Sequence, residues 1–255
     1  NAVKLQAFLD SRLYHDHDAS VFRLLPIIDF ADHHTYARGF VTHSDQESVF
    51  SALEVQYTPL PNTKRCLVNY RYKDKLSSFI LYGFYDESVP FVQSIPCRID
   101  LPNVGIFQVN APFVEGNELS IERIRVPIPD FSFSMSEYEF YAPTVLWPEP
   151  DIMEINYCLI PRAKMLPAMR EVLALQLSLW EVRKGTEKGE IATQKNIEYL
   201  EKSIVLENKN YYEKLEKAIE SSKCAKSNIA LMTLMKVIGY QKAHIENYVR
   251  KIVKP

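Results

Sequence analysis

The sequence predicts an α+β protein in which a strand-rich first part precedes a bundle of helices. The first 150 residues contain short apolar runs between turns and hold 12 of the 15 prolines. Helical amphipathic periodicity begins only after Pro167. With 255 residues, 47% of them apolar and 24% charged, the chain can form one large domain or two modest ones around a sizeable core. This composition excludes disordered and collagen-like proteins.

Four runs in the first part are expected to be strands or short buried elements, because apolar or aromatic residues alternate in them and polar turns separate them. They are residues 21–30, 49–57, 65–70 and 106–110. Several prolines between residues 127 and 150 predict extended or loop-like backbone there. Proline denies hydrogen bonds to helices and sheets alike.

Three amphipathic helices are predicted at 168–183, about 190–221 and about 226–253. Their apolar stripes are expected to bury one another and so to form a small bundle. The stripe residues of the first helix are Met169, Val172, Leu173, Gln176, Leu177 and Trp180; those of the third are Ile229, Leu231, Leu234, Met235, Ile238, Ile245, Val249 and Ile252. The many Glu and Lys residues are interpreted as a solvated face rather than as a nucleic-acid patch.

Several functional classes are excluded by missing motifs. The sequence has no G-x-G-x-x-G, Walker loop, H-E-x-x-H or G-x-S-x-G, so nucleotide-phosphate chemistry and serine hydrolysis are not expected. No apolar run approaches the roughly 20 residues that span a bilayer, and the first ten residues do not resemble a secretory signal. The four cysteines are scattered, which favours an intracellular, cytoplasmic or nuclear, reducing compartment.

Five of the six histidines lie within the first 43 residues, among several aspartates. His15, His17, His33 and His34 could therefore form a divalent-metal site, since imidazole and carboxylate groups are suitable donors. The alternative is a polar loop between two elements. The sequence favours the loop, and no metal ligand is assigned.

Two further segments point to a different chemistry. Residues 24–34, LLPIIDFADHH, form an apolar run that ends in a polar Asp-His tip. Further along, Tyr70 and Tyr82 stand twelve residues apart, and Tyr82 begins the triplet Tyr-Gly-Phe that ends at Phe84. A Ser-Arg pair at residues 11–12 precedes both segments.

This ordered set resembles the C-terminal half of the SET domain in protein-lysine methyltransferases of the Rubisco large-subunit methyltransferase type. That family has a Ser-Arg pair, an L-[VL]-P-[LM]-x-D-x-x-N-H-S element, a Tyr, and a Y-G-F twelve residues after that Tyr. Residues 160–253 are similar to the family's helical substrate-binding domain. The resemblance implies a SET-like remnant at 1–94, followed by an extended β connection and a helical substrate-binding-like domain at 95–255.

The resemblance implies S-adenosylmethionine as cofactor and a protein that presents a lysine as substrate, held by the helical domain; no nucleic acid and no membrane are expected as partners. Asp32 and His33 take the Asn-His positions that hold the methionine end of the cofactor, and Phe84 could pack on the adenine. Tyr82 takes the position of the catalytic tyrosine, and Tyr70 would line the lysine channel. Without the resemblance, Tyr82 reads as a half-buried strand or turn tyrosine with a hydrogen-bonded hydroxyl.

Some positions depart from the family pattern. Asp32 replaces the family's Asn, His34 its Ser, and Arg71 the glycine after the first Tyr. The family's N-terminal SET half with its G-x-G cofactor loop is not in this sequence, which starts without Met, as expected of a fragment. We therefore expect this chain alone to bind the cofactor weakly or not at all. The alternative is a catalytically degenerate SET-like protein that acts as a protein-interaction module.

Overall fold

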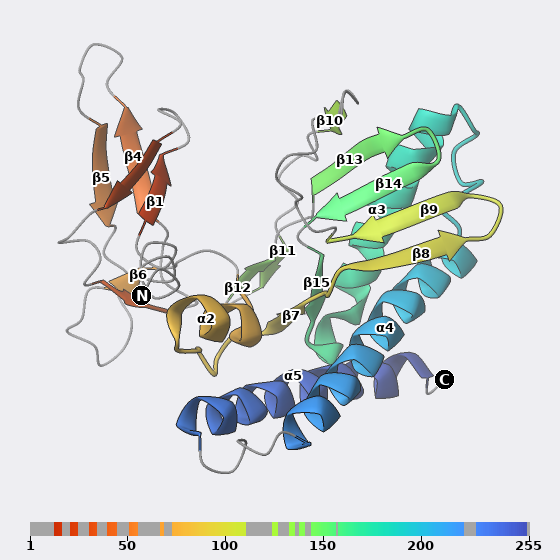
Figure 1. Ribbon diagram of the computed structural model, residues 1–255. Coiled ribbons are helices and arrows are strands. Elements are labelled where there is room, and N and C mark those ends of the chain that lie inside the picture. Colours follow the sequence, from red (N-terminus) through yellow and green to blue (C-terminus); the bar gives the residue numbers. More distant parts are fainter. Residues whose placement is uncertain are drawn as a thin grey trace. The chain divides into compact units, whose positions relative to one another are not determined.

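The computed structural model divides the chain into two compact units, residues 1–89 and 90–255 (Figure 1). It describes residues 13–16, 21–24, 31–34, 40–44, 51–55, 67–68, 73–110, 124–126, 133–135, 138–140, 144–156, 158–221 and 228–253. The architecture is α+β, with small sheets followed by three long helices, which confirms the predicted fold class.

Within its described residues, the first unit contains three two-stranded sheets and one helix. The strands β1 (Leu13–Asp16) and β2 (Val21–Leu24) pair antiparallel, as do β4 (Phe40–Ser44) and β5 (Ser51–Val55). The strand β3 (Asp32–His33) pairs parallel with β6 (Leu67–Val68). Parallel pairing brings together two segments that lie more than 30 residues apart in the sequence, so a long connection must return the chain to β3.

The segment before Tyr82 forms a helix, α2 (Lys75–Tyr82), and the expectation that Tyr82 lies in a strand or turn is wrong. Both ends of α2 are capped. The Asp74 carboxylate accepts a hydrogen bond from the Ser77 N–H at 2.8 Å, and Gly83, at φ 76°, closes the last turn with an N–H bond to Phe79. These local bonds favour a helix despite the apolar, β-prone composition of the segment.

The second unit is built around a five-stranded sheet with the strand order β10-β13-β14-β9-β8. Its strands are β8 (Cys97–Leu101), β9 (Gly105–Val109), β10 (Ile124–Val126), β13 (Thr144–Glu149) and β14 (Ile152–Asn156). The pair β14–β9 is parallel and the other pairs are antiparallel. The register of β13 against β14 shifts between Leu146 and Glu149, where Pro148 cannot donate a ladder bond.

The described residues of this unit include two shorter strand pairs as well. The strands β11 (Phe133–Met135) and β12 (Tyr138–Phe140) pair antiparallel. The strand β7 (Phe91–Gln93) pairs antiparallel with β15 (Leu159–Pro161), immediately before the helices begin. Short strands therefore occupy much of the proline-containing stretch 127–150, which agrees with the extended backbone expected there.

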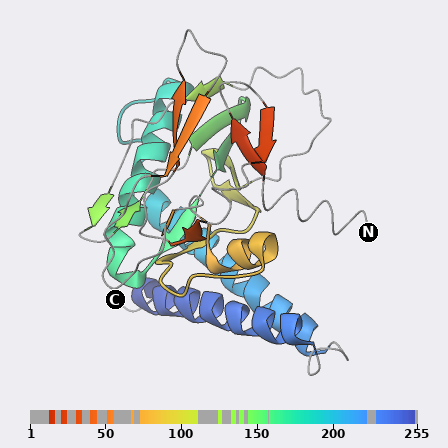
Figure 2. The same cartoon turned by 90° about the vertical axis from the view of Figure 1, so that its left-hand side faces the viewer.

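The helices α3 (Leu166–Lys184), α4 (Gln194–Glu220) and α5 (Ile229–Val253) match the three predicted helices within a few residues, and a 3-10 turn, η2 (Ala163–Met165), precedes them. In the rotated view of Figure 2, α5 is the long dark-blue helix seen from its side, with α4 beside it. All six predicted stripe residues of α3 are buried. None of the helices in the described part of the chain has a stretch long and apolar enough to cross a membrane.

One face of the five-stranded sheet packs against α3. Phe107 and Trp180 stack with their ring centroids 5.2 Å apart, and both side chains are buried. Gly105 makes this close approach possible: a Cβ atom at this position would lie 2.5 Å from Cζ2 of Trp180. At φ 148°, the backbone of Gly105 also takes a conformation that favours glycine.

Candidate functional site

Three of the residues predicted as a cofactor and catalytic site lie together in the first unit. The rings of His33 and Phe84 are 5.9 Å apart, and those of Tyr82 and Phe84 are stacked at 5.8 Å. We call His33, Tyr82 and Phe84 the aromatic cluster. Its members come from β3, from the last residue of α2 and from the segment just after the helix.

Local structure explains how these segments meet. The parallel pairing of β3 with β6 continues through a hydrogen bond from the His34 N–H to the carbonyl of Val68, at 3.1 Å. Ala31 and Val68 are buried and anchor this pair. At Gly83 the left-handed backbone ends α2, so the chain turns immediately after Tyr82. The turn places Phe84 where its ring contacts both Tyr82 and His33.

The protonation of His33 follows from its surroundings. Burial, the largest effect, lowers the pKa of His33 below its ordinary value of 6.5, and the neighbouring His34 acts in the same direction. The carboxylate of Asp86 and a hydrogen bond to the backbone of Val68 oppose this shift without reversing it. His33 is therefore neutral at pH 7, and the cluster presents aromatic rings without a positive charge of its own.

Asp86 shapes the loop that follows the cluster. Its carboxylate accepts hydrogen bonds from the N–H of Ser88 at 2.8 Å and from the Ser88 hydroxyl at 2.6 Å. Lys75, at the start of α2, donates to the carbonyl of Val89 at 2.8 Å and so ties the helix to the end of this loop. Asp86 is not among the residues predicted for the site, although an Asp two residues before a Ser is typical of such a turn.

In chemical terms, the aromatic cluster suits a ligand that has both a flat ring and a positive charge. Phe84 is 39% exposed and Tyr82 is half-buried, so part of each side chain is accessible to a ligand. Aromatic faces attract cations at close range, and the neutral imidazole of His33 adds no repulsion. The Tyr82 hydroxyl can orient a polar group at the same place.

The other residues predicted for the site do not belong to the aromatic cluster or lie outside the described residues. Asp32 lies on β3 next to His33, and its side chain is exposed. Tyr70, assigned to the lysine channel, lies outside the described residues, and so do the Ser-Arg pair at 11–12 and Arg71.

The candidate ligands for a metal site are His15, His17, His33 and His34. His17 lies outside the described residues, and only the backbone of His15 is described. Within the part of the chain that the structure places, no group of three or more His, Cys, Asp or Glu side chains is arranged to hold a metal ion.

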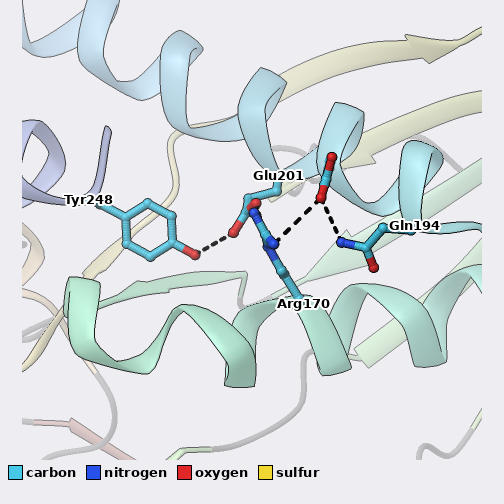
Figure 3. Close-up of polar contacts among 5 residues, drawn as sticks. Arg170, Gln194, Glu201 and Tyr248 are labelled. Atoms are coloured by element: carbon cyan, nitrogen blue, oxygen red, sulfur yellow. Dashed lines mark hydrogen bonds and ion pairs between the residues drawn. The ribbon is translucent and has the colours of Figure 1, made fainter. Parts of the chain in front are cut away.

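A second polar cluster joins the three helices of the second unit (Figure 3). Glu201 of α4, which is 1% exposed, accepts hydrogen bonds from the Tyr248 hydroxyl at 2.8 Å and from Nε of Arg170 at 2.9 Å. Arg170 also lies 3.6 Å from Glu198, which in turn accepts a bond from Gln194. Burial and the Glu201 carboxylate raise the pKa of Tyr248, so its hydroxyl stays protonated as a donor. These polar groups serve as hydrogen-bond and ion-pair partners for one another, which indicates a structural role.

A third cluster is also structural. One carboxylate oxygen of Glu181 accepts three backbone N–H bonds in the turn between α3 and α4, from Gly189 at 3.0 Å, Ile191 at 2.7 Å and Ala192 at 2.6 Å. Burial by itself would raise the pKa of Glu181, but these bonds and the charge of Lys188 outweigh it and hold the pKa below the ordinary 4.5. The ionised carboxylate organises the turn.

No protein-family model matches the chain, no curated protein is significantly similar to it, and no solved structure matches it. The resemblance to SET-domain methyltransferases therefore remains a prediction, which rests on the order and spacing of the motifs.

Proposed function

We propose that these residues are the C-terminal part of an S-adenosylmethionine-dependent protein-lysine N-methyltransferase of the SET type. The observation that carries the proposal is the ring contact between His33 and Phe84, at 5.9 Å. The two residues come from motifs about fifty positions apart, and the resemblance requires those motifs to lie side by side next to the cofactor. The stacking of Tyr82 on Phe84 supports the same arrangement.

The chemistry agrees with these side chains. Methyl transfer is an in-line displacement in which a neutral lysine amine attacks the methyl group of a sulfonium ion, and it needs alignment more than acid-base strength. In this proposal Phe84 stacks on the adenine and the Asp32-His33 segment holds the methionine end of the cofactor. A neutral His33 avoids repulsion with the sulfonium charge. The Tyr82 hydroxyl orients the methyl group and assists loss of the amine proton.

Methyl transfer to a lysine tests the role of Tyr82. The protein is produced with the residues that its gene encodes upstream and is incubated with labelled S-adenosylmethionine and an array of lysine-containing peptides. Tyr82→Phe should lower the rate by about 10²-fold or more, because it removes the orienting hydroxyl. Tyr85→Phe is the matched control, since Tyr85 lies in the same segment outside the aromatic cluster. Equal rates for wild type and Tyr82→Phe would refute the assigned role.

A catalytically degenerate interaction module is the second candidate. The substitutions Asp32, His34 and Arg71 favour it, because an aspartate in place of the family's Asn loses an amide donor to the cofactor. Under this candidate, the protein neither binds S-adenosylmethionine nor transfers methyl groups, even when it is produced with whatever residues its gene encodes upstream. Saturable cofactor binding by that protein would exclude it.

A further inference from the structure

The strand β8 lies at one edge of the five-stranded sheet (Figure 1). It pairs antiparallel with β9, and no other strand in the described part of the chain pairs with it. Its residues alternate in exposure: Arg98 and Asp100 are exposed, whereas Ile99 and Leu101 are buried. An edge strand presents backbone N–H and C=O groups with which a further strand can pair.

The hydrogen bonds of β9 show which residues of β8 direct their backbone groups outwards. The N–H of Ile106 bonds to the carbonyl of Asp151, just before β14, at 2.9 Å, so Ile106 faces away from β8. The next residue, Phe107, therefore faces β8, where its partner is Ile99. Because these directions alternate along a strand, the two neighbours of Ile99 in β8 turn their N–H and C=O groups to the open side. We call these outward groups of residues 98 and 100 the β8 edge.

Prolines limit the β8 edge to two residues. Pro96 and Pro102 flank the strand and take the next positions that alternate outwards. Since proline has no N–H, the edge offers no further donor on either side of Arg98 and Asp100. A strand that pairs here must therefore match these two residues.

The side chains at the β8 edge carry opposite charges and lie on the uncovered face of the strand. Arg98 and Asp100 form no ion pair with any described residue. Ile99 points to the other face, which it shares with Phe107, and Phe107 stacks on Trp180 of α3. The helix α3 therefore packs on the face opposite to the two charges.

The strand is complementary to a second copy of itself when two copies run antiparallel about Ile99. Arg98 of each copy then lies opposite Asp100 of the other. Both residues face the shared edge, so each pair can exchange both of its backbone N–H to C=O bonds. Opposite charges directly across two strands stabilise the pairing, whereas registers centred on Arg98 or on Asp100 would bring like charges face to face. The charges therefore select the register centred on Ile99.

We propose that two copies of this chain associate through the β8 edge, in an antiparallel pair centred on Ile99 that joins their sheets. A second copy is the occupant because the sequence Arg-Ile-Asp between two prolines matches itself both in length and in charge. This inference goes beyond the proposed methyltransferase function and does not rest on it, because β8 lies in the second unit and the aromatic cluster in the first.

Sedimentation of the 255-residue chain from about 10 µM to about 1 mM measures the association, since an interface of two residue pairs is small and weak. The average mass should rise towards that of a dimer. Arg98→Asp or Asp100→Arg should each weaken dimerisation about tenfold or more, because like charges then face one another. Lys251→Asp is the matched control, since Lys251 is exposed on α5, and it should dimerise as the wild type does. A chain that stays monomeric, or single variants that dimerise equally well, would overturn the proposal.

A charge exchange separates the β8 edge from every other surface. The double variant Arg98→Asp, Asp100→Arg again has opposite charges across the pair and should dimerise like the wild type. An equal mixture of the two single variants should also associate more strongly than either variant alone, because each copy then faces charges opposite to its own. Failure of these two rescues would show that the charges do not meet across a β8 pair, and would overturn the proposal.

Amide hydrogen exchange tests the same pairing in the wild type, without any substitution. The N–H groups of Arg98 and Asp100 gain acceptors only in the dimer, so they should exchange severalfold more slowly at about 1 mM than at about 10 µM. The N–H of Ile99 bonds to β9 within one copy and is the internal control, with similar exchange at both concentrations. Exchange of Arg98 and Asp100 that does not depend on concentration would overturn the proposal. None of these results depends on cofactor binding.

Discussion

Replacing Glu201 with glutamine should destabilise the second unit far more than the same change at Glu198. Both carboxylates lie on α4 and both contact Arg170, but the Glu198 side chain is 51% exposed and that of Glu201 only 1%. The two variants therefore carry the same substitution at two carboxylates that contact the same guanidinium, that of Arg170. The comparison separates the effect of burial from the effect of the ion pair itself.

The magnitudes follow from the contacts. Glu201→Gln leaves one acceptor oxygen where the carboxylate has two. If that oxygen accepts from the Tyr248 hydroxyl, the amide NH₂ faces the Nε–H donor of Arg170. If it accepts from Arg170 instead, the Tyr248 hydroxyl loses its acceptor. Loss of a hydrogen bond to a buried charge costs about 1.5–3 kcal/mol, and breaking a buried pair costs about 3–5 kcal/mol. Because Arg170 is partly exposed, we expect about 3 kcal/mol for Glu201→Gln. Glu198→Gln should cost less than about 1 kcal/mol, as exposed pairs do.

Thermal and urea denaturation followed by circular dichroism at the helical band measure both variants. For a unit of this size, a loss of about 3 kcal/mol lowers Tm by about 6–12 °C, whereas Glu198→Gln should shift it by less than about 4 °C. Equal shifts for the two variants, or no shift for Glu201→Gln, would show that Glu201 does not hold the helices together.

Three other predictions follow from single contacts. Gly105→Ala should lower the free energy of unfolding by several kcal/mol in a urea titration, because the new Cβ atom would lie 2.5 Å from Trp180; a wild-type midpoint would contradict the close packing. The second unit should lose stability as pH falls below 4.5, because the pKa of Glu181 is lowered in the folded state. Glu181→Gln should remove that part of the pH dependence. An unchanged pH profile in this variant would contradict the role of the Glu181 carboxylate in the turn. The first unit should lose stability as pH falls below 6.5, because the unfolded chain binds the His33 proton more readily than the folded chain. An NMR titration of His33 should accordingly show a pKa below 6.5, and a higher value would refute its burial beside Phe84.

The long helices could be predicted because their periodicity is strong and extends over many turns. The helix predicted at 168–183 is observed at Leu166–Lys184, with the expected stripe buried. The stripe of α5 was predicted too long, because periodicity shows which residues share a side of a helix but not whether another element covers that side. In the structure, Ile229 is 80% exposed, and Leu231, Leu234 and Met235 are only half-buried. Whether Ile229 is buried depends on which elements pack against the first turn of α5, and the local sequence of α5 does not contain this information.

The short elements were harder to predict. The helix α2 was missed because Phe79, Ile80 and Leu81 favour a strand, whereas Asp74 and Gly83 are helix-capping signals that decide the outcome. The proximity of the Asp-His and Tyr-Gly-Phe segments was implied only by the resemblance to a known family, and the local sequence of either segment does not predict it. The parallel pairing of β3 with β6 joins residues far apart in the sequence, and no local pattern predicts such a pair.

Cofactor binding at the aromatic cluster is the central claim, and calorimetric titration with S-adenosylmethionine tests it most directly. The protein, produced with whatever residues its gene encodes upstream, should bind saturably, and Phe84→Ala should weaken the affinity about tenfold or more through loss of stacking. Ile80→Ala, a change of another exposed apolar side chain close by in α2, should leave the affinity unchanged. Absence of binding by this protein, or equal affinity for wild type and Phe84→Ala, would contradict the account.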